Sequence, residues 1–192
     1  MKKGVFSCSA IGAFAASLLC GCESVRIPVK YVPQNSVRYV GQTDVGKFTY
    51  EPAERGKVKP DEIDCGLGNS VCTIPPVADL VRRATALELQ RTGVVVGESH
   101  KLIVCADVLQ FECKLKVGFR MKPIWTWTYS IRYRIVRKSD STVLLDRVYT
   151  PNPRKQGERT TFAAEINAMI LAGFNKFIED EEVKSIIERT EN

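Results

Sequence analysis

The chain has 192 residues, a formal net charge of +6 and 44% hydrophobic residues, so it is close to one domain in size and long enough to bury a core. The charge falls to +4 without residues 1–21, which hold two lysines and no acidic residue. So mild a basic excess gives no indication of nucleic-acid binding.

The first 22 residues have the pattern of a secretory signal that ends at a lipidation site. Two lysines precede an apolar and small-residue run over 4–19, which is too short and too rich in serine for a membrane span. The run ends in Leu19-Cys20-Gly21-Cys22, which resembles the lipobox of bacterial lipoproteins. The resemblance implies that 1–21 is a signal peptide and that Cys22 becomes the acylated, palmitate-bearing amino terminus. A plain signal peptide or an uncleaved anchor is the alternative.

Glu23 follows the modified cysteine. Lipoproteins of this type that stay at the inner membrane often carry aspartate there, so the resemblance implies an outer-membrane anchor with the domain facing the periplasm. Residues 22–36 contain two prolines and no helical period, which predicts an extended tether. Residues 37–192 are then expected to form a single periplasmic domain.

The next elements alternate between extended and helical patterns. Residues 37–51 favour a strand with Val45, Phe48 and Tyr50 buried, and 51–73 is charged and rich in glycine and proline, as in a loop. Pro75-Pro76 opens a helix that ends at Gly93. Its predicted apolar stripe is Val77, Leu80, Val81, Ala84 and Leu87, and its predicted solvent-facing residues include Arg82, Arg83, Glu88 and Gln90.

Three strands are expected next, over 101–117, 125–136 and 143–150, joined by turns at 118–123 and 138–141. In the middle strand apolar and polar residues alternate strictly, so one face is predicted to be core and the other wet. Thr161 is placed to cap a second long helix, and 179–182 is an acidic start for a last short helix. The buried stripe of the long helix is predicted as Phe162, Ile166, Met169, Ile170, Phe174 and Phe177.

Short turns between consecutive strands make neighbouring strands antiparallel. The order of elements therefore predicts an α+β fold, with a mostly antiparallel four-stranded sheet and two main helices packed on one face as a two-layer sandwich. This layout, with the lipobox, the strand at 45–48 and the helix over 77–93, resembles the YajG-like outer-membrane lipoproteins. The resemblance implies a non-enzymatic lipoprotein of the outer membrane.

Four cysteines besides Cys22 lie in the predicted domain: Cys65, Cys72, Cys105 and Cys113. In an oxidising periplasm we expect a disulfide between Cys65 and Cys72, which flank a flexible segment. Free buried thiols are the main alternative, and a metal or redox site is the remaining one. Cys105 and Cys113 lie eight residues apart on one expected strand, so they cannot bond each other.

Enzyme signatures are missing from the sequence, so no catalytic residue, metal site or cofactor is expected. His100 is the only histidine, and we interpret it as a surface turn residue. Asp107 and Glu112 differ in strand parity and are expected on opposite faces, which disfavours paired acid–base chemistry.

Two segments are candidates for a binding surface. One is a basic face of the predicted sheet, formed by Lys114, Lys116, Arg132 and Arg134, whose alternative interpretation is an ordinary wet face. The other is a hairpin tip with interleaved apolar and cationic side chains: Phe119, Arg120, Met121, Lys122 and Trp125.

The sequence therefore predicts a non-catalytic, membrane-anchored scaffold or accessory subunit that binds an envelope protein partner. A lipid- or glycan-binding component of an envelope transport system, using the positive charge for an anionic lipid or glycan, is the second hypothesis. A thiol or metal enzyme centred on Cys65 and Cys72 is the third.

Overall fold

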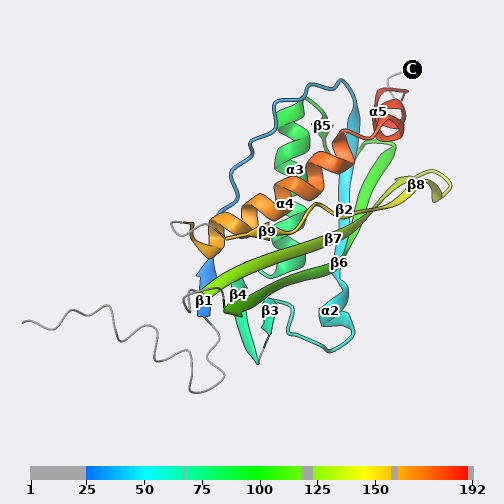
Figure 1. The fold of residues 1–192 in the computed structure, drawn as a ribbon. Helices are drawn as coiled ribbons and strands as arrows, with labels where there is room; N and C mark the ends of the chain where they lie inside the picture. Colours follow the sequence, from blue (N-terminus) through cyan, green and yellow to red (C-terminus); the bar gives the residue numbers. More distant parts are fainter. Residues whose placement is uncertain (1–24, 67, 118–122, 157–159, 190–192) are drawn as a thin grey trace, which may run out of the picture.

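The computed structural model describes residues 25–66, 68–117, 123–156 and 160–189. In these residues nine strands form one mixed sheet, and helices pack against it (Figure 1). The predicted α+β class is confirmed. The prediction of a four-stranded, mostly antiparallel sheet is wrong, because β1–β4, β2–β5, β2–β6 and β3–β6 are parallel pairs.

The elements follow one another along the chain as short and long strands around three longer helices. The strands are β1 (Val25–Pro28), β2 (Gln42–Tyr50), β3 (Glu62–Gly66), β4 (Asn69–Ile74), β5 (Val95–Val96), β6 (Leu102–Val117), β7 (Pro123–Arg137), β8 (Thr142–Tyr149) and β9 (Arg154–Lys155). The helices are α2 (Glu51–Glu54), α3 (Val77–Thr92), α4 (Phe162–Ile178) and α5 (Glu181–Glu188).

The long antiparallel pair β6–β7 is the centre of the sheet. On one side of it, β6 pairs with β2 over its first half and with β3 further along. On the other side, β7 pairs with β8 and, near its start, with β9. The outer corner β3–β4–β1 joins the rest of the sheet through one register pair, Asp64 with Glu112. This corner is therefore held to the body by few backbone hydrogen bonds.

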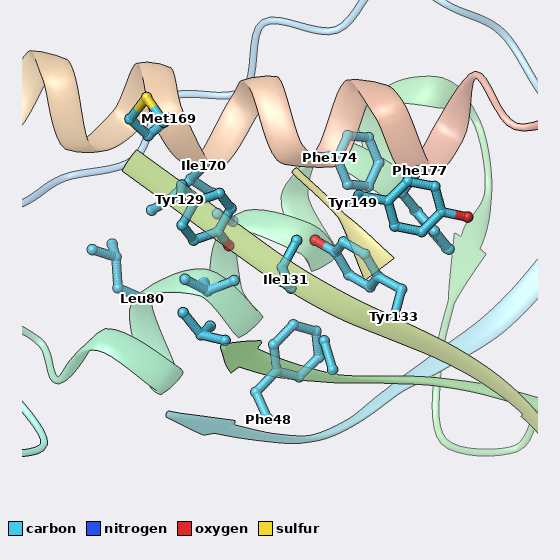
Figure 2. Packing of buried hydrophobic residues seen from close by; sticks show 14 of the residues in the cluster. Phe48, Leu80, Tyr129, Ile131, Tyr133, Tyr149, Met169, Ile170, Phe174 and Phe177 are labelled. Atoms are coloured by element: carbon cyan, nitrogen blue, oxygen red, sulfur yellow. The ribbon is translucent and has the colours of Figure 1, made fainter. Parts of the chain in front are cut away.

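The predicted alternation along β7 is confirmed, because its odd-numbered residues from Trp127 to Ile135 are buried. Tyr133 contacts both long helices: its ring stacks on Phe177 of α4 at 4.3 Å, and its hydroxyl lies 3.0 Å from that of Thr85 on α3. Figure 2 shows this layer of rings and aliphatic side chains between α4 and β7. Both helices therefore cover the same face of the sheet, as the two-layer prediction requires.

A bulge in β6 corrects one expectation from the sequence. The pairing with β7 shifts between Val108 and Gln110, so Leu109 is an extra residue. The shift changes the parity of the strand. Asp107 and Glu112 therefore lie on the same, open face of the sheet, and the prediction that they face opposite ways is wrong.

Helix α3 ends as predicted, at Gly93 in the left-handed conformation with φ 98°. Its apolar stripe is confirmed except at Leu87, which is exposed. Glu88, predicted to face water, is instead 0% exposed. Its carboxylate accepts hydrogen bonds from the Tyr31 hydroxyl and from the backbone N–H groups of Gln34 and Asn35. The burial is thus compensated by the chain that crosses the helix.

That crossing chain includes residues 29–36 of the expected tether and the first residues of the strand expected from residue 37. Residues 29–41 have neither helix nor strand, but Val29, Tyr31, Asn35 and Tyr39 are buried. Residues 29–41 are therefore a strap packed on the domain. This packing could not be predicted, because the buried side chains follow neither a helical nor a regular strand period.

The stretch expected to be a loop, 51–73, holds α2 and the hairpin β3–β4. The hairpin register places Cys72 opposite Glu62, with its thiol directed at that carboxylate, whereas Cys65 alternates to the other face with Ile63. All four described cysteines have free thiols. The disulfide expected between Cys65 and Cys72 is not formed, because the two side chains leave opposite faces of the hairpin.

Candidate binding site

A hollow of about 710 Å³ lies where three segments far apart in the sequence meet. These are the turn that leads into β6, the turn between β7 and β8, and the last helix α5. The residues that line it are Glu98, Ser99, His100, Lys101, Leu102, Arg137, Lys138, Ser139, Leu144, Ile186 and Arg189. Its volume is within the range of sites that hold small molecules or side chains of a partner. We call this hollow the α5 pocket.

The floor of the α5 pocket is aliphatic. Leu102 is the first residue of β6 and is 3% exposed, and Leu144 on β8 and Ile186 on α5 pack against the core as partly buried side chains. Ile187, the neighbour of Ile186, packs against Gly41, whose missing side chain allows this close approach. The docking of α5 on the sheet therefore shapes one wall of the pocket.

The rim of the pocket is mainly cationic. Lys138 is held by Asp44 at 2.5 Å and also donates to the backbone carbonyl of Glu98, and Arg137 pairs with Asp140 at 3.1 Å. Lys101 and Arg189 have no ion-pair partner within the described ranges, and Glu98 is the one carboxylate of the lining. The rim can therefore attract an anionic group while the floor accepts an apolar one.

The pocket and β1, the first described strand, lie toward opposite ends of α4. Asn167, in the first half of α4, donates to the backbone carbonyl of Lys30 just after β1, whereas α5 follows the end of the helix. A helix of 17 residues is about 25 Å long. Figure 1 shows β1 and α5 correspondingly far apart.

Among the described helices, none is both long and apolar enough to span a bilayer.

His100 lies in the turn before β6, as predicted, and it lines the α5 pocket beside two serines. Within the portion of the chain that the structure describes, neither Ser99 nor Ser139 is hydrogen-bonded to the imidazole of His100. No cluster of three or more metal-ligating side chains occurs in those residues either. The lining offers cationic and aliphatic side chains for binding.

The predicted basic face lies on the open side of β6 and β7. Lys114 pairs with Glu112 at 3.1 Å, Arg132 with Asp146 at 3.6 Å, and Arg134 with Asp107 at 2.8 Å. Lys116 is exposed. Lys114 lies opposite Thr126, six residues from Arg132 along β7, which is roughly 20 Å. The four cations thus share a face without forming one continuous patch.

The predicted hairpin tip is described only in part. Phe119, Arg120, Met121 and Lys122 lie outside the described residues, as does Cys22. Trp125 is half-buried, and its ring packs edge-on against Phe162 at the start of α4, with centroids 5.3 Å apart. This tryptophan therefore serves the junction between β7 and α4.

Among the residues of the α5 pocket, only His100 was considered as a candidate for chemistry from the sequence. Lys101, Leu144 and Arg189 belong to three separate segments of the chain, and each has the spacing of an ordinary surface or half-buried residue. The signal that identifies them is their convergence in space, which depends on the register of β6, β7 and β8 and on the docking of α5. No motif in the sequence carries that information.

No family model and no curated protein matches the sequence. Among solved structures, a Xanthomonas campestris protein assigned to the family DUF330 is similar, with 15% identity and a TM-score of 0.54 over 85% of this chain and 93% of that one. Weaker likenesses include PelC from Paraburkholderia phytofirmans, solved as a dodecamer (10% identity, 74% and 92% covered, TM-score 0.40), and a minor lipoprotein from Acinetobacter baumannii (9%, 78% and 94%, 0.39). The first likeness shows a shared fold at low identity, and the resemblance to the YajG-like family stays a prediction.

Proposed function

We propose that the protein is a lipid-anchored, non-catalytic accessory protein of the outer membrane that docks an envelope protein partner in the α5 pocket. The occupant would be a segment of the partner with an apolar side chain flanked by carboxylates. The observation that carries the proposal is the combination of an aliphatic floor with a cationic rim in one hollow. Charge complementarity of this kind sets partner choice and association rate.

The position of the pocket favours a protein as its occupant, rather than a lipid of the membrane that holds the anchor. β1 begins three residues after Cys22, about 10 Å of extended chain, so the β1 end of the domain would lie next to the bilayer. The pocket, at the other end of α4, would then face the periplasm. A partner reaching in from that side would meet the cationic rim first.

The test is photo-crosslinking in intact cells with a photoreactive amino acid at Ser139 on the rim of the pocket. The expected product is one envelope protein, crosslinked through an acidic and apolar peptide that mass spectrometry identifies. Reversing the two unpaired cations, Lys101→Glu with Arg189→Glu, should reduce the yield at least about tenfold, since like charges would then face the partner. Cys22→Ala, which removes the anchor, should abolish it.

Lys116→Glu is the matched control, because it reverses an exposed cation of the sheet face and leaves the pocket intact. Loss of the crosslink in this variant alone would move the docking site to the predicted basic face. Recovery of an anionic lipid or glycan at Ser139, with no protein, would favour the second hypothesis, a carrier of anionic amphiphiles. An unchanged crosslink in the pocket variant would contradict docking in the α5 pocket.

A further inference from the structure

Cys65 and Cys113 are buried neighbours on adjacent parallel strands. β3 and β6 pair in register at Asp64 and Glu112, so the next residue on each strand is a cysteine. Cys65 is 3% exposed and Cys113 is 0% exposed, and both belong to the hydrophobic core. The two thiols therefore lie on the same face of the sheet, at adjacent positions.

The two thiols also interact with each other. A hydrogen bond with Cys65, followed by burial, raises the pKa of the Cys113 thiol well above its ordinary value. Neighbouring strands are about 4.8 Å apart, within the range of Cα separations of about 4.4–6.8 Å that a disulfide accepts. The backbone is thus already placed for a bond between these two sulfur atoms.

The other two cysteines are not placed to compete. Cys72 directs its thiol at the Glu62 carboxylate on the other face of the hairpin, with Sγ 4.0 Å from Oε1. Cys105 lies opposite Arg134 on the open face of β6, beside Gly46. The register pair Asp64–Glu112, the burial of both thiols and their interaction together select Cys65–Cys113 among the four described cysteines.

We propose that Cys65 and Cys113 form a disulfide in the exported protein. The bond forms by thiol–disulfide exchange with an oxidising disulfide: each cysteine loses one proton and one electron, one S–S bond forms between them, and the oxidant is reduced to two thiols. Its occurrence in the cell rests on the export proposed above, whereas the pairing rests on the geometry of β3 and β6.

The bond would reinforce the junction between the corner β3–β4–β1 and the body of the sheet. The corner β3–β4–β1 meets the body through the single register pair Asp64–Glu112, directly beside the two cysteines. β1 is also the strand that follows Cys22 and would transmit any pull from the lipid anchor. A covalent link from Cys65 to Cys113 would hold this corner on β6 when the anchor is loaded.

The test begins with the purified full-length protein, oxidised with glutathione disulfide, alkylated and digested without reduction. The expected result is a linked peptide pair that contains Cys65 and Cys113, formed equally in Cys72→Ser and Cys105→Ser and absent in Cys65→Ser. Reduction of the oxidised wild type should lower Tm by roughly 5–10 °C. This comparison uses one sequence, so it holds even where a variant fails to fold.

Two outcomes overturn different claims. A linked pair other than Cys65–Cys113, or full alkylation of all four thiols after oxidation, would overturn the pairing. The Cys65–Cys113 bond could instead form with glutathione disulfide and be absent from protein alkylated directly in intact cells. That result would leave the pairing in place. It would overturn the claim that the bond forms in the cell, and with it the support that export gives to the proposed function.

Discussion

Glu88 is a carboxylate in the middle of α3 that has no contact with solvent, and its three hydrogen bonds all come from the strap at 31–35. The hydroxyl of Tyr31 lies 2.6 Å from it, and burial, followed by this hydrogen bond, raises the pKa of Tyr31. Glu88 is therefore one of several attachments of the strap to α3, beside the hydrogen bonds from Arg91 to the carbonyl of Asn35 and from the N–H of Tyr39 to the carbonyl of Thr92. Charge-assisted hydrogen bonds of this kind are stronger than neutral ones.

Replacing Glu88 by alanine should destabilise the protein by about 3 kcal/mol, because two buried donors and one partly buried donor would lose their acceptor. The free energy of unfolding from urea titration measures the effect. Gln90→Ala, on the exposed side of the same helix, is the control and should change stability by less than about 0.5 kcal/mol. Equal effects of the two substitutions would show that the strap does not depend on Glu88.

Gly173 allows α4 to lie close against β7. A methyl group added there would come within 2.6 Å of Cε1 of Tyr129, a ring that the core encloses on all sides. We expect Gly173→Ala to cost about 1–2 kcal/mol in thermal or chemical unfolding, since overpacking exceeds the gain of about 0.5–1 kcal/mol from helix propensity. Lys176→Ala, at an exposed position of the same helix, should be nearly neutral. A stabilised Gly173→Ala variant would mean that the two elements separate at little cost.

At the scale of elements, α5 is a short helix whose docking depends on its first residues. Asp180 caps it by accepting from the N–H of Glu182 at 3.0 Å, and it also accepts from the Tyr149 hydroxyl at 2.8 Å and from Arg147. Burial alone would raise the pKa of Asp180, but the hydrogen bonds from Tyr149, Arg147 and the Glu182 N–H outweigh it and lower the pKa. The charged form is therefore the stabilising one.

Asp180→Ala should destabilise the protein at pH 7 by about 1–2 kcal/mol, the range for loss of an N-cap. Because the folded-state pKa lies below the ordinary value of 3.8, this contribution is present above pH 3.8 and is lost as pH falls through the lower folded value. The difference in unfolding free energy between wild type and variant should thus shrink below pH 3.8. Asp146→Ala, an exposed carboxylate on β8, is the control, and a difference independent of pH would contradict the assignment.

The elements whose own residues follow a regular local pattern could be predicted from the sequence. The alternation of β7, the proline start and glycine end of α3, and the Thr161 cap of α4 all have the predicted form, with Thr161 accepting from the N–H of Ala164 at 3.2 Å. A regular pattern over ten or more residues leaves few alternative structures.

Strands that form only by pairing with residues far away in the sequence have no such pattern. β1, β5 and β9 have two to four residues each, and β1 and β5 are strands because they lie beside β4 and β2. The bulge at Leu109 reverses which residues of the second half of β6 point to the core. The alternation of residues in that strand does not indicate the bulge. The α5 pocket depends on the registers of β6, β7 and β8 and on the docking of α5, so its lining could not be predicted from the sequence.

At the scale of the whole molecule, β1 starts three residues after the predicted acylated cysteine, a separation of at most about 10 Å, and the α5 pocket lies toward the far end of α4. So short a connection, followed by a strap bound to α3, leaves little room for the domain to turn over. The α4 axis is therefore expected to point away from the bilayer.

The orientation can be measured with a fluorescent amino acid at Arg26 or at Ser139, in the acylated protein bound to phosphatidylethanolamine–phosphatidylglycerol vesicles that carry a headgroup quencher. Arg26, in β1, should be quenched strongly, and Ser139, in the turn between β7 and β8 on the rim of the α5 pocket, should be close to unquenched. Cys22→Ala should show no quenching at either site. Equal quenching at both sites would mean that the domain lies on its side, with the cationic rim of the α5 pocket beside the headgroups; an anionic lipid would then be the better candidate for its occupant than a protein reaching in from the periplasm.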